Sequence, residues 1–249
     1  MSIEGEFGGP RLGVLGGMGP MASAWFMVRL TALAQAGVDQ EHIPTILWSD
    51  PRVPDRTAHY FGHGADPWPW LEHGLRALRS AGATAVAIPC NTAHLWYERM
   101  AAATDLPILH IVDAVVHDLL RQGVRDGTVG LLGTEATLQS GLYQSALANR
   151  GYVHIELTAE EQAQWPSRAI AMVKANKIDE ALAPAVQAVK LLQSRGAQAV
   201  VLGCTELPIA LPAAQRSAFQ MPIADSIDAL AKDSIAWYQR AVESARAAH

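Results

Sequence analysis

Residues 80–91 read SAGATAVAIPCN, and residues 194–205 read SRGAQAVVLGCT. Each stretch contains a Gly-Ala pair near its start, continues as a short aliphatic run and reaches one of the two cysteines of the chain near its end. Short aliphatic runs of this kind are typical of strands that are buried on both faces of a parallel sheet. The two stretches therefore predict two copies of one strand, with Cys90 and Cys204 at the carboxyl ends.

The repetition extends beyond the cysteines. The segment Gly13-Val-Leu-Gly16 recurs as Gly130-Leu-Leu-Gly133, and Leu106-Pro-Ile108 recurs as Met221-Pro-Ile223. Three matching points in the same order favour an internal duplication over chance similarity in an alanine-rich chain. Two copies are too few for a solenoid, so we expect two related lobes.

The alternation of aliphatic runs with helical patterns is typical of an α/β fold with parallel sheets. We expect two pseudo-symmetric lobes, each with a mostly parallel sheet of about four strands flanked by helices, and an active site between the lobes. The first lobe is expected to comprise residues 11–111 and 223–249, and the second residues 112–222. The expected strands are 11–15, 44–48, 84–89 and 107–111 in the first lobe, and 128–132, 153–157, 198–203 and 222–224 in the second.

The composition narrows the class of protein. The chain has 249 residues, 50% of them hydrophobic and 17% charged, which is enough to bury a sizeable core. A net charge of −5 without a basic run argues against a nucleic-acid partner. No apolar run reaches the ~18 residues of a membrane-spanning helix, and residues 1–7 carry acids and lack the form of a signal peptide. We therefore expect a cytoplasmic protein with reduced thiols and no membrane partner.

The chemistry is expected at one edge of the sheets. In open parallel α/β folds, ligands bind beyond the carboxyl ends of the strands, and both cysteines follow expected strands and precede expected helices. The amino end of a helix favours a thiolate. We therefore predict that two thiols approach one ligand from opposite sides. The donors expected beside them, which suit a carboxylate, are Asn91, Thr92, Thr134 and Thr205.

Five motifs occur along the chain: GGMGP at 16–20, DQEH at 39–42, PDRT at 54–57, PCNTAH at 89–94 and GCTEL at 203–207. Together they resemble the aspartate racemase family, within the aspartate/glutamate racemase superfamily, and the resemblance covers nearly the whole chain. Glutamate racemases look more distant, because they carry Asp-Ser-Gly after the first strand and a histidine where this chain has Glu206. The resemblance implies a cofactor-independent amino-acid racemase that forms a homodimer and binds a small amino-acid substrate.

The mechanism implied by this resemblance is two-base proton transfer. One cysteine, as thiolate, removes the α-proton, and the other, as thiol, delivers a proton to the opposite face. Positive residues that match Arg56 and Lys174 hold the carboxylates of the substrate in the family. The expected catalytic residues are Cys90 and Cys204, and no metal or cofactor is expected. The expected substrate-binding residues are Met18, Asp55, Arg56, Thr57, Asn91, Thr92, Ala93, Thr134, Lys174 and Thr205.

Several residues have two interpretations at this level. His94 either reaches toward the thiol of Cys90 or packs inside the protein. Glu206 either caps a helix or orients a substrate ammonium group. His59 and His63 are four residues apart, but no acidic or cysteine ligand joins them, which disfavours zinc. The glycines between residues 13 and 19 do not fit the dinucleotide-binding pattern.

The function also has alternatives. Aspartate and glutamate are the preferred substrates, and acceptance of neutral amino acids stays open. A second enzymatic possibility is isomerisation or decarboxylation of a small dicarboxylate through a similar carbanion. The non-enzymatic possibility is a two-lobed binding module that closes on a small acid, with both cysteines serving as packing residues.

Overall fold

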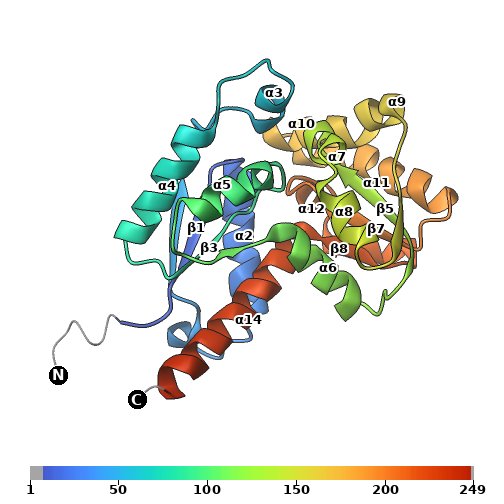
Figure 1. The fold of residues 1–249 in the computed structure, drawn as a ribbon. Helices are drawn as coiled ribbons and strands as arrows, with labels where there is room; N and C mark the ends of the chain where they lie inside the picture. The colour runs from blue at the N-terminus through green and yellow to red at the C-terminus, as the bar shows by residue number, and fades with distance from the viewer. Residues whose placement is uncertain (1–7, 248–249) are drawn as a thin grey trace.

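The computed structural model describes residues 8–247 as two α/β lobes that lie side by side (Figure 1). Each lobe contains one four-stranded, fully parallel sheet, which confirms the expected fold class. The strand orders are β2-β1-β3-β4 and β6-β5-β7-β8. The first sheet comprises β1 (Leu12–Gly16), β2 (Thr45–Ser49), β3 (Ala85–Ala87) and β4 (Ile108–Leu109). The second comprises β5 (Gly127–Gly133), β6 (Tyr152–Ile155), β7 (Ala199–Gly203) and β8 (Ile223–Asp225).

The two sheets have the same topology. In each, the first strand along the chain lies between the second and the third, and the fourth pairs with the third. All eight expected strands are present. The main difference is β4, which is only two residues long because the chain turns into helix α6 (Ile111–Arg121) directly afterwards.

The lobe boundary expected at residue 223 is wrong for one strand. β8 pairs with β7, so residues 223–225 belong to the second sheet. The repeat explains this result, because Met221-Pro-Ile223 matches the segment that leads into β4, the last strand of the first sheet. We propose that the boundary lies after Asp225, where the terminal helix α14 (Ser226–Ala247) begins.

Helices cover both faces of each sheet and fill the space between them (Figure 1). The helix α14 runs back from the second sheet to pack on α6 and on a helix of the first lobe, α2 (Pro20–Leu33). The other first-lobe helices are η1 (Asp39–Glu41), α3 (Arg56–Tyr60), α4 (Trp68–Ser80), η2 (Thr92–Trp96) and α5 (Tyr97–Ala102). Those of the second lobe are α7 (Glu135–Gln139), α8 (Leu142–Ala148), α9 (Ala159–Gln162), η3 (Ala163–Ser167), α10 (Arg168–Lys174), α11 (Ile178–Ser194), α12 (Leu207–Ala210), α13 (Ala213–Arg216) and η4 (Ser217–Phe219).

The main hydrophobic core lies between the two sheets. It joins inward side chains of β1 and β3 to those of β5 and β7 through α6 and α14. The alternate side chains of the same strands point outward into two smaller cores, beneath α4 in the first lobe and beneath α10 and α11 in the second. Because every central strand is buried on both faces, its sequence is a continuous aliphatic run. This shared core fixes how the two strand edges face each other.

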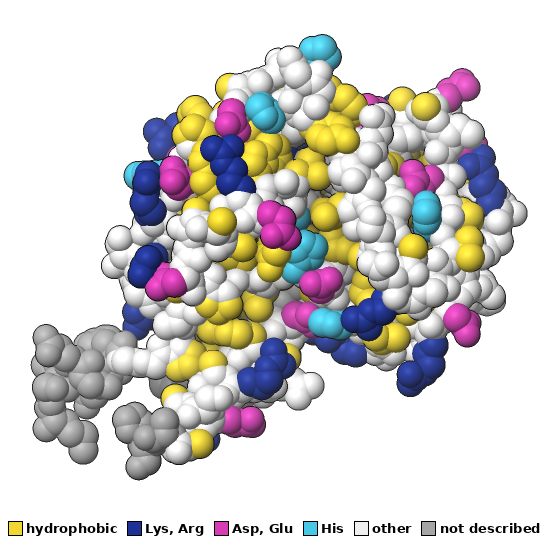
Figure 2. Space-filling model, viewed as in Figure 1, with side chains coloured by type: hydrophobic (Ala, Val, Ile, Leu, Met, Phe, Trp, Pro, Cys, Tyr) yellow, Lys and Arg dark blue, Asp and Glu magenta, His cyan; other side chains and the backbone are white. Residues whose placement is uncertain are grey.

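The surface carries charges of both signs, and Figure 2 shows basic and acidic side chains interspersed on one face. None of the helices in residues 8–247 has the length and apolar character required to cross a membrane. The segment 1–7, on which the expectation about a signal peptide rests, lies outside the described residues.

Candidate active site

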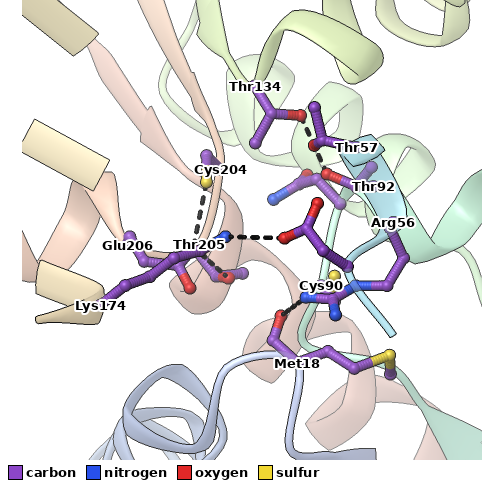
Figure 3. Close-up of a pocket in the computed structure, with 12 residues that line it drawn as sticks. Met18, Arg56, Thr57, Cys90, Thr92, Thr134, Lys174, Cys204, Thr205 and Glu206 are labelled. Atoms are coloured by element: carbon purple, nitrogen blue, oxygen red, sulfur yellow. Dashed lines mark hydrogen bonds and ion pairs between the residues drawn. The ribbon is translucent and has the colours of Figure 1, made fainter. Parts of the chain in front are cut away.

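The strand ends of both sheets converge on one cavity between the lobes (Figure 3). Cys90 follows β3, Thr134 follows β5 and Cys204 follows β7, as expected for a ligand site in a parallel α/β fold. The cavity has a volume of about 10 Å³. The residues that line it are Met18, Asp55, Arg56, Thr57, Cys90, Asn91, Thr92, Thr134, Lys174, Cys204, Thr205 and Glu206.

The lining contains every expected site residue except Ala93. That side chain is fully buried in the outer core of the first lobe, because the tight turn of η2 directs it away from the cavity. Glu206 is the one lining residue for which the sequence suggests no definite role in the site. Substrate binding by Ala93 is therefore not supported, whereas the geometry brings all other expected residues together.

The two cysteines enter the cavity from different lobes (Figure 3). Both are free thiols, and each is 4% exposed. The helices that follow them, η2 and α12, are only about one turn long, so the helix macrodipole contributes less than the sequence suggests. The side chains around each thiol must therefore determine its chemistry.

Cys204 donates a hydrogen bond to a carboxylate from its own loop. Its Sγ lies 3.0 Å from Oε2 of Glu206, and Oγ1 of Thr205 donates to the same oxygen at 3.2 Å. Burial and the charge of Glu206 raise the pKa of Cys204 well above its ordinary value, although Lys174 acts in the opposite direction. The Glu206 side chain makes no capping hydrogen bond to α12, so its carboxylate serves the thiol and not the helix.

Asn91, next to Cys90, is held by residues that no local sequence signal identifies. Its Oδ1 accepts a 2.5 Å hydrogen bond from the hydroxyl of Tyr143 on α8, and its Nδ2 donates to Oγ of Ser226 at 3.1 Å. Tyr143 and Ser226 are fully buried. Burial, and secondarily the charge of Cys204, raise the pKa of Tyr143 well above its ordinary value, so its hydroxyl remains a donor. Asn91 lines the cavity, and its amide has a second N–H besides the one that Ser226 accepts.

Three threonine hydroxyls form a triangle across the lobe interface. Oγ1 of Thr92 lies 2.9 Å from Oγ1 of Thr134 and 3.1 Å from that of Thr137, and the last two are 2.9 Å apart. Thr134 also caps α7 by accepting from the backbone N–H of Thr137. Thr137 lies on the buried face of α7, which gives no sequence signal for a contact with the first lobe.

Arg56 is buried beside the cavity with part of its guanidinium group unpartnered. Its Nη1 donates to the carbonyls of Val53 and Pro54, and its Nη2 donates to that of Met18. The Nε of this residue is buried and has no hydrogen-bond partner. A buried donor without a partner is costly, so this Nε–H is a position where a carboxylate would be favourable.

The carbonyl of Met18 reaches Arg56 because of a tight glycine turn after β1. Gly17 has a φ of +91°, and a Cβ at this position would collide with the backbone of Asp50. Only glycine therefore fits. This turn explains the glycine motif better than a nucleotide-binding loop does.

An ion pair between the lobes lies in the wall of the cavity. Nζ of Lys174, on α10, lies 3.6 Å from Oδ2 of Asp55, which caps α3 by accepting from Ala58 at 2.8 Å. Burial acts against the charge of Lys174, but the acidic groups Glu206, Cys204 and Asp55 outweigh it and raise the pKa of this lysine. Two larger cavities, of about 330 and about 310 Å³, are each lined by both members of the pair.

His94 is a structural residue of the Cys90 loop. Its Nε2 accepts from the backbone N–H of Ile111 at 3.1 Å, so its Nδ1 carries the proton and donates to the carbonyl of Cys90 at 2.9 Å. Burial, and secondarily His110, lower the pKa of His94 to about 3. The imidazole thus fixes the backbone of the cysteine and does not reach its thiol. Within residues 8–247, no group of three or more His, Cys, Asp or Glu side chains has the arrangement of a metal site.

Comparisons with known proteins agree with this arrangement. A family model described as Asp/Glu/hydantoin racemase matches residues 15–233. The broad specificity amino-acid racemase RacX of Bacillus subtilis is 28% identical over 233 residues, which covers 91% of this chain and 97% of that protein. The structure of an aspartate racemase from Picrophilus torridus is similar, with a TM-score of 0.81 at 28% identity, and the match covers 93% of this chain and 95% of that one. A glutamate racemase from Francisella tularensis shares the fold, with a TM-score of 0.66 at 16% identity over 92% of this chain and 81% of that one.

Proposed function

Since the chain belongs to the Asp/Glu/hydantoin racemase family, we propose that it interconverts the L and D forms of aspartate, glutamate or both by proton transfer between Cys90 and Cys204. The enzyme is an amino-acid racemase. The observation that carries the proposed mechanism is that two free thiols, from matching positions of two lobes, line one small cavity. Both thiols can then reach one carbon from opposite sides.

The chemistry follows from the weak acidity of an amino-acid α-carbon. One thiolate takes the α-proton, the electron pair moves toward the α-carboxylate, and the other thiol returns a proton on the opposite face. Donors aimed at the carboxylate stabilise the developing charge in a site that excludes water. The free N–H of Asn91, the Thr92 hydroxyl and the Nε–H of Arg56 are suitable donors.

Access to the cavity requires a movement. A volume of about 10 Å³ is near the minimum for one water molecule, and an amino acid is several times larger. Lys174 and Asp55, which are in contact with each other, both line this small cavity and the two wider ones. We infer that this pair opens to admit the substrate, after which Lys174 can bind a substrate carboxylate.

Incubation of L- and D-aspartate and L- and D-glutamate in D₂O tests this function. Racemisation predicts loss of the Cα–H signal in NMR together with loss of optical rotation, because the returned proton comes from solvent-exchanged thiol. Release of CO₂ or a rearranged carbon skeleton would support another carbanion reaction, and binding without exchange would support the binding module. Either result would contradict the proposed racemisation.

A wider substrate range is a second candidate. The cations Arg56 and Lys174 of the lining are matched by the acids Asp55 and Glu206, so the site does not carry the excess positive charge that would restrict it to acidic substrates. The relative from Bacillus subtilis is itself described as having broad specificity. A racemisation screen over all amino acids distinguishes the two, since strict acid specificity predicts turnover of aspartate and glutamate alone.

We also propose that the protein is a homodimer in the cytoplasm. The outer face of α2 exposes Met21, Trp25 and Val28 at helical spacing, and Leu47 of the edge strand β2 is exposed beside it. An apolar face of this kind suits a second copy of the same lobe. Light scattering should give a dimer mass that Trp25→Glu with Val28→Glu reduces to a monomer mass. Val153→Glu, at an exposed apolar position of the other lobe, should leave the dimer intact.

A further inference from the structure

In the two copies of the strand that ends in a cysteine, the second residue after the cysteine differs. Thr92 lies two residues after Cys90, and Glu206 lies two residues after Cys204. Thr92 bonds across the interface to two threonines of the other lobe. Glu206 turns instead to the thiol of its own loop. We call the loop of Cys90 and the loop of Cys204 the two half-sites. They therefore differ by a buried carboxylate.

The hydrogen bond of Cys204 has a defined direction. A carboxylate accepts, so the proton in the 3.0 Å contact between Sγ and Oε2 of Glu206 lies on sulfur. The same oxygen also accepts from Thr205, and Glu206 is 4% exposed. In the described residues, Cys90 has no corresponding contact with a carboxylate. We propose that Glu206 holds the proton on Cys204 and thereby makes Cys90 the thiol that removes the α-proton in the resting enzyme.

The charges around Cys204 support this proposal. Loss of its proton would place a thiolate beside the Glu206 carboxylate in a buried site, and like charges at this separation repel strongly. The other groups that face the thiol are Lys174 from α10, whose charge favours the thiolate, and the neutral Tyr143 from α8. Burial and Glu206 together outweigh Lys174. The remaining charged residues of the cavity, Arg56 and Asp55, belong to the first lobe.

The proposal rests on the proposed racemisation for its catalytic consequence. When Cys90 removes the α-proton, the Cα–H bond breaks and an S–H bond forms on Cys90. Cys204 then loses its S–H proton to the opposite face of the carbon and becomes the thiolate beside Glu206. Release of the product leaves this second form of the enzyme, which returns to the first when Cys204 regains a proton from water and Cys90 gives one up.

This difference predicts unequal kinetics for the two enantiomers. The enantiomer that needs Cys204 as the base binds only the rare second form, so its apparent KM is raised by the reciprocal of that form's population. Because a racemisation equilibrium constant is one, its kcat must be raised by the same factor. Wild-type enzyme should therefore show a ratio of KM values, D to L, that differs from one and equals the ratio of kcat values.

A measurement on the thiol alone tests the proposal without any substrate. The chain has two cysteines, so Cys90→Ala leaves Cys204 as the only thiol. The pH dependence of its alkylation by iodoacetamide, followed by intact mass, gives its ionisation midpoint. Adding Glu206→Gln should lower this midpoint by about one to two pH units, because the like charge is removed. Adding Glu135→Gln, which removes an exposed acid that lines a neighbouring cavity and has no contact with either thiol, should not shift it.

A second variant guards against a folding defect in Glu206→Gln. Glu206→Thr gives the second half-site the residue of the first and should lower the midpoint in the same direction. An unchanged or raised midpoint in a folded Glu206 variant would overturn the proposal. In the enzyme with both cysteines, Glu206→Gln should move the KM and kcat ratios toward one by at least about threefold, and unchanged ratios would overturn the catalytic consequence. Absence of racemisation on every amino acid would instead remove the proposed function and leave the thiol measurement valid.

Discussion

The two half-sites share a backbone plan but are held in place differently. The loop of Cys90 is fixed from outside, because Asn91 bonds to Tyr143, Thr92 bonds to Thr134, and His94 ties the Cys90 carbonyl to α6. The loop of Cys204 is fixed from within, through the bonds of Cys204 and Thr205 to Glu206. Duplication thus preserves the strand and the thiol that follows it, while the neighbouring side chains diverge.

This difference makes the first half-site depend on how the lobes dock. The three cross-lobe hydrogen bonds of the Cys90 loop end on second-lobe helices: on Tyr143 of α8, on Thr134 at the N-cap of α7 and on Thr137 of α7. The ring of Tyr143 also lies against Gly203, the residue before Cys204. One buried side chain therefore touches the residue before one cysteine and hydrogen-bonds to the residue after the other. The separation of the thiols is set by the shared core and not by either loop alone.

The largest expected effect comes from removing either thiol. Cys90→Ala and Cys204→Ala should each lower kcat for racemisation by about 10³ or more, because the proton acceptor or the proton donor is lost. Each variant should still exchange the α-proton of one enantiomer in D₂O without inversion, since the remaining thiol can remove a proton and return it to the same face. The two variants should act on opposite enantiomers. Racemisation at the wild-type rate in either variant would contradict the two-thiol mechanism.

The next largest effect concerns the two cations, one from each lobe. Arg56→Lys should lower kcat/KM by about 10- to 100-fold, because a lysine cannot keep three backbone carbonyls and also present a donor to a carboxylate. Lys174→Arg keeps the charge of a partly exposed side chain and should cost less than about tenfold. Steady-state kinetics with the preferred substrate measures both. A larger loss from Lys174→Arg than from Arg56→Lys would mean that Lys174, and not Arg56, is the main contact of the substrate carboxylate.

Much of the fold and of the cavity lining was predictable from local patterns. The aliphatic runs identify all eight strands, and the repeat places Cys90 and Cys204 at equivalent strand ends. Because ligands bind at the carboxyl edge of a parallel sheet, residues that directly follow strands, such as Thr134, were also expected there. The repeat even contains the information needed for the lobe boundary, since Ile223 matches Ile108 of β4.

The contacts that support the site were not predictable, because they join residues far apart in the sequence. Tyr143 lies 52 residues from Asn91, and Ser226 lies 135 residues from it. Tyr143, between Leu142 and Gln144, has no local feature that distinguishes it from an ordinary core side chain. The cap of α6 was not predictable either: Asp113 has the residue type of a capping side chain, but the side chain of His110 caps the helix by accepting from the backbone N–H of Asp113. The sequence places Glu206 two residues after Cys204, but only its side-chain conformation shows that the carboxylate reaches the thiol.

A smaller effect tests the support of Asn91 across the interface. Tyr143→Phe should lower kcat by about tenfold, because Asn91 loses the hydrogen bond that orients its amide toward the cavity, and should lower the free energy of unfolding by ~1–2 kcal/mol. Tyr152→Phe is the matched control. It removes a hydroxyl that donates to the carbonyl of Val124 at 2.7 Å outside the cavity, so it should affect stability but not kcat. Equal kcat values for the two variants would show that Asn91 is held without Tyr143.

The smallest effect on catalysis is expected from His94, which fixes the backbone of Cys90. The protonation of this histidine should instead make the stability of the protein depend on pH. Burial lowers the pKa of His94 from an ordinary value of 6.5 to about 3 in the folded protein. Between these values the unfolded chain binds a proton that the folded protein does not, so the free energy of unfolding falls as the pH is lowered through this window, by at most about 1.4 kcal/mol per pH unit. His94→Gln removes this proton uptake. In urea titrations, the difference in the free energy of unfolding between wild type and His94→Gln should therefore shrink as the pH is lowered from 7 toward 5. The control is His63→Gln, at an exposed position, in which the free energy of unfolding should change with pH as in the wild type. A constant difference across this range would mean that His94 binds its proton in the folded protein, which is incompatible with its Nε2 accepting from Ile111.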